Sequence, residues 1–140
     1  MRKLGAFLGA FLALTALSFD AYAKRPHKIL AVNEIVPGTK AIGFSVFRGA
    51  EPEPFDVILG EPNDQVVPGR VILLARVSKG PMPTPLEVTG PVAGMSGSPI
   101  FVGCKKYQEC LDRGTLVGAL SYGFVPFPQG GMNTGLTPAA

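Results

Sequence analysis

Glycine and proline interrupt this chain at short intervals, and their density most constrains what it can fold into. The sequence holds 18 Gly and 14 Pro among 140 residues, yet 46% of its residues are apolar. No segment after Ala23 keeps a helical spacing of apolar residues over about ten positions or more. A polar disordered tract and a helical bundle are therefore excluded. The expected fold is one small all-β domain of roughly six to eight strands.

Short apolar segments between turn signals define the expected strands. The segment 40–47 alternates with period two, which predicts a half-buried strand. The more continuous apolar run 71–77 predicts a central strand. Two Pro-Gly pairs predict turns, at Pro37-Gly38 and Pro68-Gly69. The apolar residues that should share a face are Ile42, Phe44 and Val46 in the first segment and Phe55, Val57 and Leu59 in the next.

The first 23 residues have the pattern of a secretory signal peptide. Two basic residues precede an uncharged apolar run at 5–19, and the small-x-small sequence Ala21-Tyr22-Ala23 follows it. The run is shorter than the roughly 20 residues of a membrane span. We therefore expect cleavage after Ala23, with no stable membrane anchor left, although an uncleaved N-terminal anchor is the alternative. The mature chain is then secreted or periplasmic.

The mature chain of 117 residues is expected to have an N-terminal arm at 24–34 and one domain at 35–140. Its net charge of +2 is scattered (the signal removes two basic residues and one acidic residue from a net +3). A nucleic-acid partner would need a longer basic face with aromatic platforms. The sequence therefore predicts no nucleic-acid partner.

Two cysteines, Cys104 and Cys110, lie between two apolar runs that read as strands. An exported chain forms disulfides, and the spacing is not CxxC, so a structural disulfide that staples the neck of a β-hairpin is favoured over a redox or metal pair. Closing so short a loop is worth about 2 kcal/mol. With one His and two Cys in the chain, no metal site is expected, and no organic cofactor is implied.

The segment 94–99 (GMSGSP) is where chemistry is most expected. Small residues form a tight loop that runs directly into an expected strand. Such a loop exposes Ser96 Oγ at a turn apex and points the backbone N–H groups of Gly94 and Ser96 to one side, which is the geometry of an oxyanion hole. The spacing alone leaves open a structural Gly/Ser turn that feeds a hairpin.

The sequence GMSGSPIF at 94–101, followed by GTLVGALSYG at 114–123, resembles the core of the SpoIVB-type serine peptidase family. Segments near 35–57 and Gly135-Leu136-Thr137-Pro138 also resemble that family. The resemblance implies a chymotrypsin-like architecture of two barrels, and this chain would supply a small chymotrypsin-like barrel domain, either complete or incomplete. It also implies that Ser96 is the nucleophile and that Gly94 and Ser96 form the oxyanion hole. The partner that the resemblance implies is a peptide or protein substrate.

A Ser nucleophile needs a base, and His27 is the one histidine of the chain, so it is the tentative base. It lies on the N-terminal arm, which is expected to be exposed and mobile. Asp64 is a candidate acid in a turn, and Asp56 is its alternative on a strand. Lys79 is an alternative base for a Ser–Lys dyad.

The length leaves three hypotheses open. A two-barrel protease needs roughly twelve strands, and this chain supplies about half of them. Thr137 and Pro138 have the pattern of an N-cap and a first helical residue, so the domain is expected to be truncated where a helix begins. The chain is then a secreted serine endopeptidase, an inactive relative that binds partners, or a fragment of a longer protein. In each case an extended peptide could pair with an edge strand.

Overall fold

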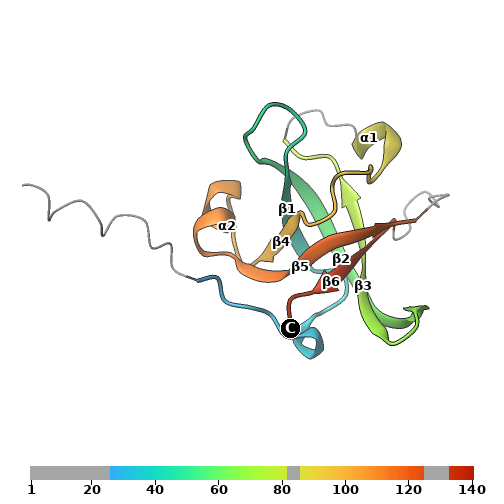
Figure 1. Ribbon diagram of the computed structural model, residues 1–140. Helices are drawn as coiled ribbons and strands as arrows, with labels where there is room; N and C mark the ends of the chain where they lie inside the picture. Colours follow the sequence, from blue (N-terminus) through green and yellow to red (C-terminus); the bar gives the residue numbers. More distant parts are fainter. Residues whose placement is uncertain (1–25, 82–85, 125–132) are drawn as a thin grey trace, which may run out of the picture.

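Six antiparallel strands close into a barrel in the computed structural model, which describes residues 26–81, 86–124 and 133–140. Their order around the barrel is β1-β2-β3-β6-β5-β4, and β4 pairs with β1 (Figure 1). The predicted all-β fold is confirmed. The predicted signal peptide and its cleavage site lie outside the described residues. The strands are β1 (Lys40–Ser45), β2 (Glu53–Val67), β3 (Arg70–Ser78), β4 (Pro99–Val102), β5 (Thr115–Gly123) and β6 (Thr134–Pro138).

The barrel interior is filled by side chains from alternate positions of the strands. Phe55, Val57 and Leu59 of β2 are all buried there, which confirms their predicted shared face. Gly43 of β1 lies opposite Phe55 in the strand register, and a Cβ atom at Gly43 would overlap the Phe55 ring. The ring therefore occupies the space that the glycine leaves free. Strand β3 lies between β2 and β6 in the closed barrel.

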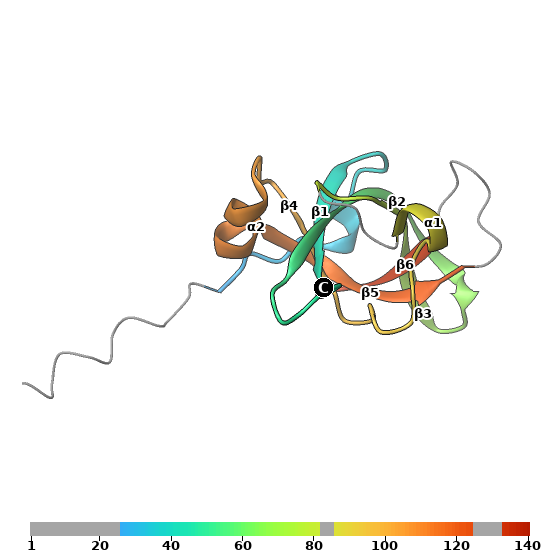
Figure 2. The same ribbon diagram turned by 90° about the horizontal axis from the view of Figure 1, so that it is seen from above.

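A second apolar cluster, the outer cluster, lies outside the barrel. Phe44, Phe101 and Cys110 are buried at its centre. Helix α2 (Tyr107–Arg113) covers it, and Figures 1 and 2 both show this helix outside the barrel next to β4. The prediction of a half-buried β1 is therefore wrong, because Ala41 packs in the interior and Phe44 in the outer cluster. The partly buried members are Ile42, Cys104, Tyr107, Leu111 and Leu116.

The predicted disulfide is present between Cys104 and Cys110, whose Cα atoms are 5.3 Å apart. Strands β4 and β5 are paired neighbours, so the disulfide does lie in a hairpin connection. Cys110, however, belongs to α2 and not to the neck of a strand. The bridge therefore ties the helix to the end of β4. A helix of 7 residues is too short to show a periodic pattern in the sequence.

The N-terminal arm pairs with β5 around residues 28–30, although Lys28 and Ile29 are exposed there, as expected from the sequence. Leu30 N donates to Leu116 O (2.8 Å), and Leu116 N donates to Lys28 O (2.7 Å). Strand β6 ends with Pro138 opposite Gly118, so β6 does not reach the backbone groups of Leu116. The arm fills this place in parallel orientation, because the backbone polar groups of a buried strand need partners. A short 3-10 helix, η1 (Val32–Glu34), follows.

Thr137 and Pro138 lie in β6 and do not begin a helix, so the predicted helix start is wrong. Thr137 pairs with Ala119, and the neighbouring Leu136 is fully buried between β5 and β3. Pairing on both sides outweighs the local N-cap pattern. The closed barrel also gives each described strand two neighbours, so the expected edge strand for an extended peptide is not found among them.

Candidate functional site

The segment 94–99 connects helix α1 (Leu86–Thr89) to β4 through two consecutive turns. Met95 N donates to Val92 O (3.2 Å), and Ser98 N donates to Met95 O (3.0 Å). Gly94 and Gly97 have φ values of +98° and +90°, as the third position of a type II turn requires. Met95 is 2% exposed in the barrel core and anchors the point where the two turns meet. The glycines thus allow the loop to bend twice around one buried side chain.

Ser96 is exposed at the second position of the second turn. In the part of the chain that the structure describes, its hydroxyl forms no hydrogen bond, and the N–H groups of Gly94 and Ser96 donate none. Gly97 N, by contrast, donates to Leu120 O (2.8 Å) and is not available to a ligand. The loop therefore presents one hydroxyl and two unbonded donors that are two residues apart.

A hollow of about 350 Å³, the loop hollow, lies beside this segment. No charged side chain is among its lining residues. Ser98 also lines it and is 7% exposed, yet no hydrogen bond to its hydroxyl is found among the described residues. Buried hydroxyls normally have partners, so this one needs an explanation. The apolar side chains of the lining belong to Phe44, Val46, Pro52, Pro99 and Leu111.

The connection between β1 and β2 supplies one wall of the loop hollow and is held by an ion pair. Arg48 Nη2 donates to Glu53 Oε2 at 2.6 Å, and Arg48 Nε donates to Glu53 Oε1 at 3.3 Å. These hydrogen bonds lower the pKa of the Glu53 carboxyl, so the pair stays ionised at neutral pH. The pair spans the connection that carries Val46 and Pro52, and it fixes that wall.

His27 is part-buried against β4 and the start of β5. Its Nδ1 lies 2.8 Å from Gly114 O, and its ring centroid lies 4.8 Å from that of Phe101. A carbonyl oxygen only accepts, so Nδ1 carries the proton and Nε2 is the basic nitrogen. No hydrogen bond joins His27 to Ser96 among the described residues. The structure thus places the tentative base against the outer cluster, and the exposed position expected from the sequence is wrong.

Asp64 lies at the far end of β2 from the loop hollow. Pro52, directly before β2, lines the loop hollow, whereas Asp64 is eleven positions (64 minus 53) after the first residue of β2. Asn63 Oδ1 accepts hydrogen bonds from the backbone N–H groups of Gln65 (2.8 Å) and Val66 (3.1 Å). Asp64 therefore lies within β2, where the register is irregular between Asn63 and Val67, so its predicted position in a turn is wrong, and the structure does not bring it to Ser96.

The alternative acid, Asp56, and the alternative base, Lys79, both lie in the described part of the chain. Asp56 faces Tyr107 on the outside of the barrel. Lys79 directly follows β3, and a Cβ atom at its neighbour Gly80 would overlap Pro54 O near the start of β2. Lys79 is thus at the same end of the barrel as the loop hollow, but no bond joins it to Ser96 in the described residues.

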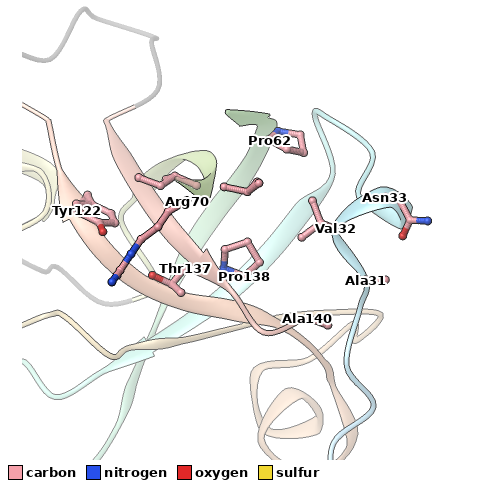
Figure 3. A pocket seen from close by; sticks show the side chains of 11 residues that line it. Ala31, Val32, Asn33, Pro62, Arg70, Tyr122, Thr137, Pro138 and Ala140 are labelled. Carbon is pink, nitrogen blue, oxygen red and sulfur yellow. The ribbon is translucent and has the colours of Figure 1, made fainter. Parts of the chain in front are cut away.

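A larger hollow, of about 850 Å³, lies elsewhere, between η1, the β2–β3 hairpin and β6. Figure 3 shows Arg70 extending toward Tyr122 and Thr137, with Val32 on the far side. Its lining is mostly apolar and includes none of the predicted catalytic residues. It therefore adds no group to the chemistry of the loop.

Neither a metal cluster nor a membrane-spanning helix is found in the described part of the chain. No three His, Cys, Asp or Glu side chains are grouped there to hold an ion, and no described helix is long and apolar enough to cross a membrane. No family model matches the sequence, and searches of curated proteins and of solved structures return no match. The resemblance to SpoIVB-type peptidases therefore rests on the motif residues.

The sequence pointed to Ser96 and Gly94 but not to the hollow beside them. The sequence assigned no function to Ser98 within the motif. It placed Val46 only on one face of an expected strand. Their shared position arises because the β1–β2 connection folds over the start of β4. No local signal in the sequence records that contact.

Proposed function

We propose that this protein is an extracytoplasmic serine endopeptidase-like domain of the SpoIVB type, with Ser96 as the nucleophile toward a peptide bond. The observation that carries the proposal is the loop itself. Ser96 is exposed at a turn, and the N–H groups of Gly94 and Ser96 have no partner in the described residues. Two free donors beside a hydroxyl suit an oxyanion that forms when the hydroxyl attacks a carbonyl.

The fold supports the proposal that this chain corresponds to one of the two barrels of a chymotrypsin-like enzyme. Six antiparallel strands close on themselves, and the loop with Ser96 leads directly into β4. This is half of the roughly twelve strands of a two-barrel enzyme. The disulfide between Cys104 and Cys110 supports export, because such bonds persist in oxidising compartments. We assign the chain to the Ser-bearing barrel.

The proposed reaction is acyl transfer to Ser96. Its Oγ forms a bond to the scissile carbonyl carbon, and the N–H groups of Gly94 and Ser96 hold the resulting oxyanion. The hydroxyl proton passes to a base and then to the leaving amine as the C–N bond breaks. Water then hydrolyses the acyl-enzyme. His27 offers Nε2 as the base of this chain, but acylation requires that it leave its present contacts or that another group reach Ser96.

The contacts of His27 favour a second candidate function, a catalytically inactive relative that binds peptides or proteins. Its ring is held by Gly114 O and Phe101, and no described group is hydrogen-bonded to Ser96. Such a domain would keep the loop for recognition and would lack the proton transfer that catalysis needs. The two functions share the same surface and differ in the reactivity of Ser96.

Reaction with a fluorophosphonate probe tests the proposal. We expect covalent labelling of the purified protein at Ser96, located by mass spectrometry of the modified peptide. Ser96→Ala should abolish labelling, whereas Ser78→Ala, an exposed serine at the end of β3, should retain it. If the folded protein is not labelled at Ser96, Ser96 is not a reactive nucleophile. The peptide-binding function would then be the remaining candidate.

A further inference from the structure

We propose that the loop hollow is a subsite for one aliphatic side chain of the bound peptide, of about the size of leucine. The inference rests on the proposed function, because it places that side chain next to the bond that Ser96 would attack. Gly94 connects the two places, since its N–H is a candidate oxyanion donor and the residue also lines the hollow.

The chemistry of the lining selects an uncharged, apolar group. Its side chains are mostly apolar, and none of them carries a charge. A charged substrate side chain would lose its hydration there without gaining an ion pair, which is strongly unfavourable. The volume of about 350 Å³ is near the lower limit of ligand sites, so it suits one side chain with its adjacent backbone.

The glycines of the loop keep the hollow open. Cβ atoms at Gly94 and Gly97 would meet no atom within 4 Å, so the space beside each is empty. Both residues have positive φ, which makes any other residue there strained. The conformation that exposes Ser96 thus also leaves no side chain at these two positions of the lining.

Ser98 supplies the polar anchor of the subsite. Its hydroxyl is buried, lines the hollow and has no partner among the described residues. The backbone of Ser98 is fully engaged, since its N–H donates to Met95 O and its carbonyl accepts from Leu120 N. The hydroxyl alone is left for a ligand, and a peptide group of the substrate beside the aliphatic side chain satisfies it.

Binding to the Ser96→Ala protein tests the subsite without turnover. Two blocked tetrapeptides, identical except that one carries Leu where the other carries the near-isosteric Asn, are titrated while backbone amide NMR shifts are recorded. We expect shifts at Val46, Gly97 and Ser98 and an affinity at least tenfold higher for the Leu peptide. Equal affinities, or shifts confined to other residues, would overturn the subsite.

Filling the hollow provides an independent test. Val46, which is 51% exposed on its rim, is replaced in Val46→Trp, and the matched control is Val66→Trp at a position that is 43% exposed and outside the hollow. We expect Val46→Trp to abolish the preference for the Leu peptide and Val66→Trp to keep it. The same preference in both variants would place the binding site elsewhere.

The outcomes separate the subsite from the catalytic proposal. Fluorophosphonate labelling of Ser96 without a preference for the Leu peptide would overturn the subsite and support Ser96 as the nucleophile. A Leu preference at the hollow without labelling would overturn catalysis and leave a peptide-binding site. Absence of both would overturn both.

Discussion

The barrel interior and the outer cluster are two apolar cores built by different means. The interior is closed by six strands alone, and residues such as Phe55 and Leu59 fill it from alternate positions. The outer cluster depends on a helix of 7 residues, a disulfide and the docked arm around Phe101. One face of β4 is therefore stabilised by the sheet itself, whereas the other depends on parts that the sheet does not hold in place.

Truncating one phenylalanine in each core should give the largest effects. We expect Phe55→Ala to lower the free energy of unfolding by about 3–5 kcal/mol, because rigid strands surround the cavity. Phe101→Ala should cost about 3 kcal/mol, at the low end of that range, because α2 and the arm can settle into the space. Urea denaturation of both variants measures this. Equal losses would show that the two clusters behave as one core.

Removal of the disulfide should have an intermediate effect that is confined to the outer cluster. The double variant Cys104→Ala and Cys110→Ala should lose about 2 kcal/mol, since the reduced chain gains freedom only in a short loop. Amide hydrogen exchange should quicken in α2 and remain slow at Leu73 in β3. Loss of protection throughout the barrel would contradict the separation of the two cores.

The smallest effect should come from Tyr107 at alkaline pH. Burial and the nearby Asp56 carboxylate raise the pKa of Tyr107 above its ordinary value of 10.0. The neutral phenol therefore stabilises the fold fully below about pH 10, and this contribution is lost as the pH rises through the folded-state pKa. The stability of Tyr107→Phe should fall less between pH 9 and 11 than that of the original protein, by about 1 kcal/mol or less. Identical thermal melts of the two proteins over this range would contradict the shift.

The barrel interior could be predicted from the sequence, whereas the outer cluster could not. Alternation at Phe55, Val57 and Leu59 correctly predicted an interior face, because a strand that is covered on its inner side leaves that pattern. It failed for β1, because period two separates two faces without saying whether one of them is solvated. The helix that covers Phe44 lies more than sixty positions further along the chain.

The candidate site also has a part that the sequence predicts and a part that it does not. The glycines and Ser96 are consecutive, so the local turn chemistry could be predicted from the motif. The loop hollow combines that motif with Val46 and Leu111, and His27 meets Gly114 at a separation of 87 residues. Such contacts depend on the barrel closing, and no local pattern encodes them. The helix start at Thr137 failed for the same reason, since pairing with Ala119 decides its conformation.

The docked arm has a consequence for how the chain is made. Its partners on the barrel, around Leu116, are synthesised long after Lys28 and Leu30 have left the ribosome. Synthesis proceeds from the N-terminus, so the arm has no binding site until nearly the whole barrel has emerged. Throughout that interval the beginning of the nascent chain remains accessible to any machinery that acts on N-termini. Docking of the arm therefore follows the synthesis of β5 and takes no part in the earlier steps of barrel formation.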